Sequence, residues 1–124
     1  MSDGYRICII ERDLFVSQDM VDSLLFVMPS VECSIFESAT EARLSTQHNS
    51  DPQLVVISAD ADGNLRISPE DMIWLKQRGV ITFDAHNQAA FPEWTHMNKP
   101  FAEDDLVQAV KRFLGVTDGR VATA

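Results

Sequence analysis

The sequence predicts a single α/β domain built on a doubly wound, parallel β-sheet. Short apolar runs rich in β-branched residues alternate with longer amphipathic segments along the 124-residue chain. Those longer segments can form crossover helices, which join parallel strands and cover both faces of a sheet. The length and the 45% hydrophobic content fit one hydrophobic core. We therefore expect one domain over 1–124, with its core in 5–114.

The first strand and helix are indicated by a change in the spacing of the apolar residues. The segment 5–10 is a continuous apolar run that ends in charged residues, which is typical of a buried strand. Asp13 is a suitable N-cap for a helix over 14–28, and Pro29 ends that helix. Its apolar residues share one face, which we expect to point inward: Val21, Leu24, Leu25 and Met28.

The next two strands flank a short helix. The segment 31–36 predicts the second strand, and Ser38 or Thr40 begins a helix that extends to about residue 47, with Ala42 and Leu44 inward. Turn-forming residues occupy 48–52. The most hydrophobic run of the chain, 54–57, predicts the third strand, which ends at Ser58.

A polar loop over 59–68 leads to a helix that begins near Pro69 and ends at Gly79. Its predicted inward side chains are Met72, Ile73, Leu75 and Trp74. The segment 80–83 predicts the fourth strand, and 95–98 gives a weaker pattern for a fifth. Between them, Pro92 limits any helix in 85–94 to about one turn.

The last helix spans 103–114. Its first turn is acidic and its last turn carries Lys111 and Arg112, as the helix dipole favours, and Gly115 closes it. The tail 115–124 predicts no regular element and is expected to be flexible.

Charge and composition restrict the function. A formal net charge of −9 argues against binding to nucleic acid, because phosphate contacts need a basic surface. No secretory leader and no membrane-length apolar run is evident, so we expect a cytoplasmic location and no membrane contact. Cys8 and Cys33 lie in strand-like runs without metal-ligand spacing, which indicates reduced, buried thiols. We expect no metal and no cofactor.

In a parallel sheet of this kind, chemistry gathers at the carboxyl ends of the strands. The residues there are Glu11-Arg12-Asp13, Ser58, Asp84 and Lys99-Pro100-Phe101. Their order and spacing resemble those of the bacterial response-regulator receiver family over residues 5–114. The resemblance implies a flavodoxin-like sheet of five strands in the order 2-1-3-4-5. It also aligns Glu11 and Arg12 with the family's acidic pair, Ser58 with its phosphorylated aspartate, Asp84 with its Ser/Thr and Lys99 with its lysine.

Three of these five positions depart from the family pattern. A serine hydroxyl at position 58 cannot form the acyl phosphate that a carboxylate forms. Arg12 places a permanent cation where a magnesium ion needs oxygen ligands. Asp84 has no hydroxyl to donate to a phosphoryl group and would repel it. The sequence therefore predicts an atypical pseudo-receiver that is not an enzyme, in which Lys99 and Arg12 pair with Glu11 and Asp84.

A second departure lies after the fourth strand. Lys99 lies 15 positions after Asp84, fewer than the family uses for a complete helix with its loops, so a shortened or missing fourth helix is predicted. Aromatic side chains near this point are either a partner surface or a filling for the space the helix would occupy. They are Phe91, Trp94, His96 (the position of the family's switch aromatic) and Phe101.

The resemblance implies a signalling or adaptor protein of a two-component pathway that works without phosphorylation. Its partner would be a histidine kinase, another receiver or a second copy, with a homodimer as one option. The main alternative is a phosphorylatable receiver that uses Asp60 and magnesium. A calcium loop over 60–71 lacks its required glycine, serine phosphorylation at Ser58 has no supporting motif, and no glycine-rich phosphate loop is present.

Overall fold

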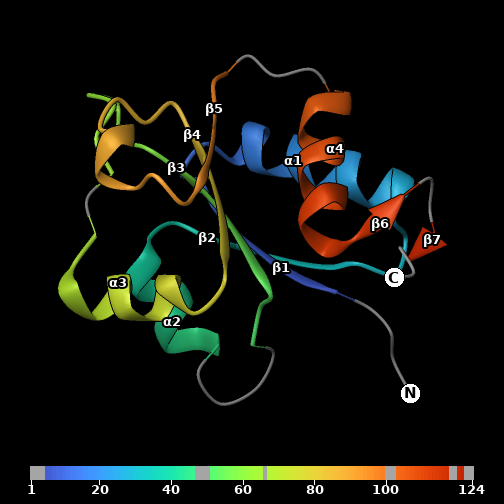
Figure 1. The fold of residues 1–124 in the computed structure, drawn as a ribbon, viewed down its shortest axis with the longest axis horizontal. Helices are drawn as coiled ribbons and strands as arrows, with labels where there is room; N and C mark the ends of the chain where they lie inside the picture. Colours follow the sequence, from blue (N-terminus) through green and yellow to red (C-terminus); the bar gives the residue numbers. More distant parts are fainter. Residues whose placement is uncertain (1–4, 47–50, 66, 100–102, 118–119, 122–124) are drawn as a thin grey trace.

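A computed structural model of the chain describes residues 5–46, 51–65, 67–99, 103–117 and 120–121. Five parallel strands form one sheet in the order β2-β1-β3-β4-β5, which confirms the predicted fold class (Figure 1). The strands are β1 (Arg6–Ile10), β2 (Glu32–Phe36), β3 (Leu54–Ser58), β4 (Gly79–Phe83) and β5 (Thr95–Met97).

Four α-helices cover the two faces of the sheet: α1 (Leu14–Val27), α2 (Ala39–Thr46), α3 (Pro69–Lys76) and α4 (Glu103–Leu114). The helices α1 and α4 lie on one face, and α2 and α3 lie on the other (Figure 1). None of the helices within the described residues is long and apolar enough to span a lipid bilayer.

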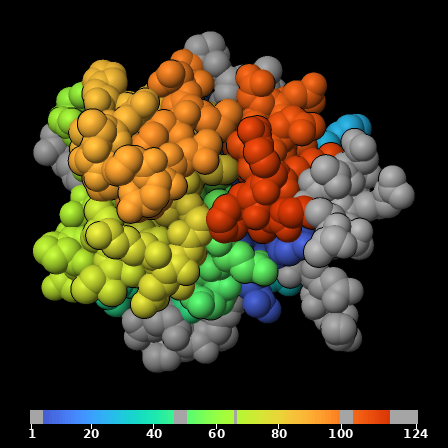
Figure 2. Space-filling model, in the orientation of Figure 1, coloured from blue at the N-terminus to red at the C-terminus, as the bar shows by residue number. Residues whose placement is uncertain are grey.

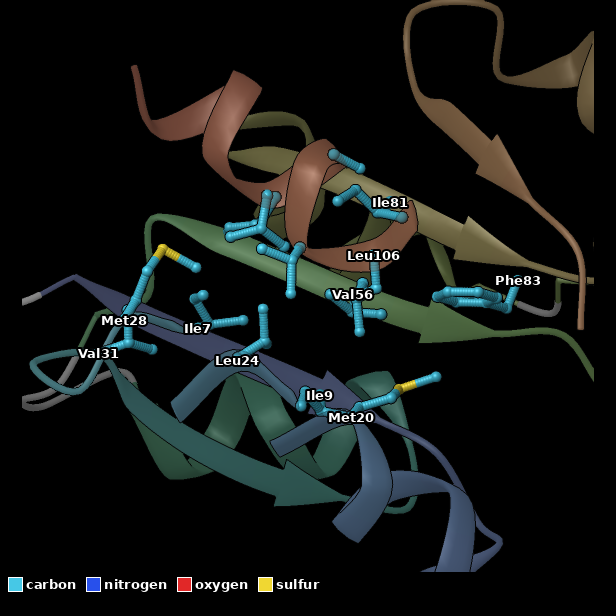
Figure 3. Packing of buried hydrophobic residues seen from close by; sticks show 14 residues of the cluster. Ile7, Ile9, Met20, Leu24, Met28, Val31, Val56, Ile81, Phe83 and Leu106 are labelled. Carbon is cyan, nitrogen blue, oxygen red and sulfur yellow. The ribbon is translucent and has the colours of Figure 1, made fainter. Parts of the chain in front are cut away.

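Alternation along the strands divides the interior into two apolar clusters. In β1, Ile7 and Ile9 point to the α1–α4 side, and Cys8 and Ile10 point to the α2–α3 side. Figure 3 shows the first cluster, in which the α1 side chains point toward β1 and β3. Because both faces are covered, the central strands β1, β3 and β4 are almost continuously buried, which accounts for their apolar sequences.

The predicted loss of the fourth crossover helix is confirmed. The segment between β4 and β5 contains one turn of 3₁₀-helix, η1 (Gln88–Ala90), in place of an α-helix. Trp94 is buried and stacks on Phe91, with 4.7 Å between ring centroids and 3° between ring planes. Of the two alternatives, Trp94 follows the second: its ring is buried in the α2–α3 cluster and is not part of an exposed partner surface. In Figure 2 this segment, in light orange, forms a continuous surface with α3, in yellow.

Three inward side chains predicted from periodicity are in fact exposed: Leu25 by 38%, Leu44 by 54% and Ile73 by 64%. The helix α1 packs through Met20, Leu24 and two serines, Ser17 and Ser23, which leaves Leu25 on its outer flank. Short helices with mixed patterns give a weak face signal, and here smaller or neighbouring residues take the inner positions.

After α4 the described residues form two short antiparallel strands, β6 (Val116–Thr117) and β7 (Arg120–Val121), where the sequence predicts no element. Val and Thr favour extended backbone, but two-residue strands are too short to leave a period that can be recognised in a sequence.

Candidate functional site

The predicted site residues lie around one cavity at the carboxyl ends of β1, β3 and β4. The cavity has a volume of about 570 Å³ and is lined by residues 10–13, by residues of the loop after β3, and by Asp84, His86 and Lys99. The parallel sheet brings these segments together because each follows, or ends, a strand on the same edge.

Glu11 is the centre of the hydrogen-bond network in this cavity. Its carboxylate is buried, with 7% of the residue exposed. The Ser58 hydroxyl donates to Glu11 Oε1 at 2.5 Å, and Lys99 Nζ donates to the same oxygen, also at 2.5 Å. The backbone N–H of Asp13 donates to the other oxygen, Oε2, at 2.9 Å. Both carboxylate oxygens are therefore occupied by donors from the protein itself.

These contacts favour the ionised form of Glu11. Burial raises the pKa of Glu11, but the hydrogen bonds from Lys99 and Ser58 and the nearby ammonium charge outweigh burial and hold the pKa below its ordinary value. The Glu11–Lys99 ion pair is thus electrically balanced inside the cavity, as predicted.

Asp84 does not take the predicted role as a partner for a side-chain cation. Its Oδ1 accepts the backbone N–H of Lys99 at 2.8 Å, and its own N–H donates to the carbonyl of Met97 at 2.9 Å. Asp84 has a φ of 63°, a left-handed conformation that Asp tolerates better than most residues. Asp84 therefore joins the end of β4 to the end of β5, while Arg12 is exposed and forms no ion pair within the described residues.

Asp13 caps α1, as the sequence predicts. Its Oδ1 accepts the backbone N–H of Phe15 at 2.9 Å and of Val16 at 3.3 Å. Because the Asp13 N–H also holds Glu11, this one residue connects the network to the first turn of α1.

The alternative acceptor Asp60 also lines the cavity, two residues beyond the end of β3. Its backbone forms a turn, in which its carbonyl accepts the Gly63 N–H at 2.8 Å and its N–H donates to Asn64 at 3.0 Å. Asp71, which would end the rival calcium loop, instead pairs with Arg43 at 2.7 Å and Thr40 at 2.6 Å on α2. Among the described residues, no three His, Cys, Asp or Glu side chains are grouped for a metal ion.

His96 is tied into the structure by both ring nitrogens. Nε2 lies 2.8 Å from the carbonyl of Phe91, and Nδ1 lies 2.6 Å from the Thr82 hydroxyl. A carbonyl can only accept, so Nε2 carries the hydrogen in this arrangement. His96 therefore fixes the segment that replaces the missing helix against β4. Of the residues predicted to form a partner surface, Phe101 lies outside the described residues.

No protein-family model matches the sequence, and no curated protein matches it either. Solved structures are similar in fold. The phosphorylated cyanobacterial phytochrome response regulator RcpA has a TM-score of 0.61 and 13% identity, with 90% of this chain and 92% of that chain covered. A two-component transcriptional regulator AraC from Clostridium phytofermentans ISDg has a TM-score of 0.59 and 12% identity, with 87% and 90% covered. The chain has the fold of a response-regulator receiver domain.

Sequence reasoning missed one residue of this receiver fold that holds the site's surroundings together. Thr82 is fully buried in β4, one residue before the end of the strand, and its hydroxyl contacts His96. The two residues are partners in the β4–β5 register. Only a correct register between the fourth and fifth strands would have paired them in advance, and the weak pattern of the fifth strand does not fix that register.

Proposed function

We propose that this chain is a pseudo-receiver: a signalling or adaptor protein of a two-component-type pathway that acts by binding a protein partner without being phosphorylated. We further propose that it acts in the cytoplasm and has no phosphotransfer activity of its own. The observation that supports this most strongly is the occupied carboxylate of Glu11. In the family that the chain resembles, this position helps to bind a magnesium ion, whereas here Lys99, Ser58 and Asp13 donate to both of its oxygens.

The chemistry of the site supports the same proposal. A magnesium ion at Glu11 Oε1 would have to displace the ammonium of Lys99 and the hydroxyl of Ser58. Two neighbouring carboxylates would each lose a contact on binding the metal, because the Asp13 carboxylate caps α1 and Asp84 binds the backbone of Lys99. Ser58 offers a hydroxyl in place of an acceptor carboxylate. The network therefore favours one stable state of the site.

The test is an amide NMR titration of the ¹⁵N-labelled protein with magnesium chloride, followed by beryllofluoride, a mimic of a phosphoryl group. We expect no saturable shift at Glu11, Ser58, Asp84 or Lys99 at millimolar magnesium. A magnesium titration of an authentic receiver under the same conditions is the positive control. Saturable shifts around the cavity would overturn the proposal.

The titration also tests the alternative in which Asp60 is the phosphorylated residue. If Asp60 is phosphorylated, beryllofluoride shifts should centre on 59–64 and disappear in the Asp60→Asn variant. The Asp62→Asn variant is the matched control, because it changes a carboxylate of the same loop two residues away. Shifts lost in Asp60→Asn but kept in Asp62→Asn would establish the alternative.

A further inference from the structure

A second cavity lies at the amino ends of β4 and β5, on the edge of the sheet opposite to Glu11. Its volume is about 430 Å³, which is within the range of small-molecule sites. Its lining consists of residues 76–80, residues 93–95 and Phe113. These residues come from α3 on one face of the sheet and from α4 on the other, so the cavity extends around the edge of the sheet (Figure 1). We call it the edge cavity.

The register of β5 leaves the beginning of β4 uncovered in the edge cavity. Thr95, the first residue of β5, pairs with Ile81. Gly79 and Val80, the first two residues of β4, therefore extend beyond the start of β5 and pair with β3 alone. On the β5 side, the backbone of these two residues borders the cavity instead of a strand.

One backbone donor at this uncovered edge has no partner. Successive residues of a strand direct their N–H groups to opposite neighbouring strands. The Gly79 N–H points to the β3 side, where it donates to the carbonyl of Gln53 at 3.2 Å. The Asp84 N–H points to the β5 side, where it donates to the carbonyl of Met97 at 2.9 Å. By this alternation the N–H of Val80 also points to the β5 side, and it has no hydrogen-bond acceptor among the described residues.

This unpaired N–H favours an occupant that carries an acceptor atom. Val80 is 5% exposed, and a buried donor without an acceptor is unfavourable for the fold. A ligand that places an oxygen at the start of β4 would supply the acceptor that a longer β5 would otherwise provide.

The side chains of the edge cavity provide an aromatic wall. Trp94 is buried, and Phe113 of α4 is 48% exposed. The Phe113 ring lies directly over the backbone of Gly79, where an added Cβ would collide with it. Glycine at the first position of β4 therefore allows the ring to form one side of the cavity. Aromatic and apolar linings of this kind bind the ring system of a ligand.

The charges around the cavity favour an anion. Lys76 lines the edge cavity, and Arg112 lines a smaller hollow that shares the Phe113 wall. Both cations are exposed, and neither forms an ion pair in the part of the chain that the structure describes. Arg78 also lines the cavity but is already held by an ion pair. Among the described lining residues Glu93 is the only carboxylate, so positive charge is in excess here on a protein with a formal net charge of −9.

We propose that the edge cavity binds a small aromatic carboxylate. The ring of the ligand lies against Trp94 and Phe113, and a carboxylate oxygen accepts the N–H of Val80 beside the ammonium of Lys76. A water molecule would satisfy the Val80 N–H but would leave the aromatic wall in contact with solvent. The inference goes beyond the proposed function and does not rest on it, because the cavity and Glu11 lie on opposite edges of the sheet.

The test compares three probes that share one ring system and differ in charge: 2-naphthoate, 2-naphthylmethanol and 2-naphthylmethylamine. Each is titrated into the ¹⁵N-labelled full chain and followed by amide NMR. We expect 2-naphthoate to bind with a Kd of about 1 mM or below, with shifts at 76–80 and 93–95. The amide proton of Val80 should move downfield, because it gains a charged acceptor. The alcohol should bind about threefold more weakly, and the amine more weakly still.

Variants of the protein test the role of each charge. Lys76→Gln should weaken 2-naphthoate about threefold and leave the alcohol unchanged, whereas Glu93→Gln should strengthen 2-naphthoate because a repelling carboxylate is removed. Phe113→Ala should weaken both probes, because both lose the same wall. Arg6→Gln is the matched control: it removes an exposed cation at the amino end of β1 and should change the affinity less than about 1.5-fold. All four positions are exposed, so the fold should be retained.

Three outcomes would overturn the assignment. They are the absence of saturable shifts up to about 10 mM 2-naphthoate, which would leave water as the occupant, binding of the amine as tight as that of 2-naphthoate, and equal effects of Lys76→Gln and Arg6→Gln. A peptide with a free C-terminal Phe that binds at least about tenfold more tightly than 2-naphthoate would assign the cavity to the C-terminus of a protein instead. These shifts map to 76–80 and 93–95, whereas the magnesium titration reports on Glu11 and Ser58, so the two proposals can fail separately.

Discussion

Replacing Lys99 by Met tests whether the Glu11–Lys99 ion pair stabilises the fold. The substitution keeps most of the apolar stem of residue 99 but leaves the buried Glu11 carboxylate with the Ser58 hydroxyl and the Asp13 N–H alone. Two unit charges about 4 Å apart interact by about 4 kcal/mol at an effective dielectric constant near 20. The lysine side chain is 24% exposed, so solvent screening and the cost of desolvation reduce the net effect. We expect the free energy of unfolding to fall by about 2 kcal/mol at pH 7.

The dependence on pH has a definite sign. The pKa of Glu11 is lowered in the folded state, so its ion pair stabilises the fold fully above the unfolded pKa of about 4.3. That stabilisation is lost as the pH falls through the lower, folded-state pKa. The difference between wild type and Lys99→Met should therefore be large at pH 7 and should shrink toward pH 3.

The assay is urea unfolding at a series of pH values, followed by the fluorescence of the two buried tryptophans, Trp74 and Trp94. In thermal unfolding at pH 7, Lys99→Met should also lower the midpoint temperature by about 8 °C. Adding Glu11→Gln to Lys99→Met removes the unpaired charge, so the double variant should lose about 1–2 kcal/mol less than the sum of the two single losses.

The matched control is the exposed pair Arg6–Glu32, whose atoms lie 3.5 Å apart with side chains 48% and 65% exposed. Arg6→Met should change stability by less than about 0.5 kcal/mol at any pH. If Lys99→Met behaves like Arg6→Met, or if the Glu11 and Lys99 effects simply add, the ion pair does not stabilise the fold.

Three further predictions concern the site and its surroundings. Ser58→Asp with Arg12→Asp should bind magnesium by calorimetry where the wild type does not, and a folded double variant without uptake would contradict the alignment of the strand ends. Gly63→Ala should destabilise by about 2 kcal/mol and Gly115→Ala by about 1 kcal/mol in thermal unfolding. Both glycines have positive φ, but an added Cβ at Gly63 would lie 2.2 Å from the His86 ring, whereas nothing lies within 4 Å of one at Gly115. Equal losses of stability in the two variants would show that the contact with His86 does not matter. Trp94→Ala should cost about 3–5 kcal/mol of stability by urea unfolding, and a loss below about 1 kcal/mol would show that its ring does not fill the core.

The variant designed to bind magnesium keeps Asp84 for a structural reason. Restoring the whole family pattern would also replace Asp84 by Thr. At a φ of 63° a β-branched residue is strained, and the Asp84 carboxylate that holds the Lys99 N–H would be lost as well. The double variant that keeps Asp84 therefore isolates the effect of the two carboxylates at positions 12 and 58 from a local loss of stability.

The fold was predictable from the sequence because its central strands are buried on both faces. The runs 5–10, 54–57 and 80–83 contain almost only apolar residues, and they match β1, β3 and β4 to within one residue. The cap at Asp13 was predictable for a local reason, since its carboxylate binds N–H groups only two and three residues away. Features that depend on contacts close in sequence, or on complete burial, leave a signal in a single sequence.

The sequence predicted which residues line the candidate site, but only some of the contacts between them. Strand ends and charge placed Glu11 beside Lys99, because both follow strands on one edge of the sheet. The same reasoning gave Asp84 a cation partner, whereas its carboxylate accepts a backbone N–H. That contact depends on the left-handed turn at Asp84, which no residue pattern reveals. The prediction that Leu44 and Ile73 point inward was wrong for a related reason. Their helices are eight residues long and have too few turns to define an inner face.

Asp13 links Glu11 to the first turn of α1. Its N–H holds Glu11, and its carboxylate holds the first turn of α1, directly before Leu14 and Phe15. In a receiver that alternates between two states, the contacts of the acidic segment would change as the metal and the phosphoryl group arrive. Here the donors to Glu11 come from the protein itself. If the site works without phosphorylation, as proposed, the contacts of Asp13 at the start of α1 should be the same with and without magnesium.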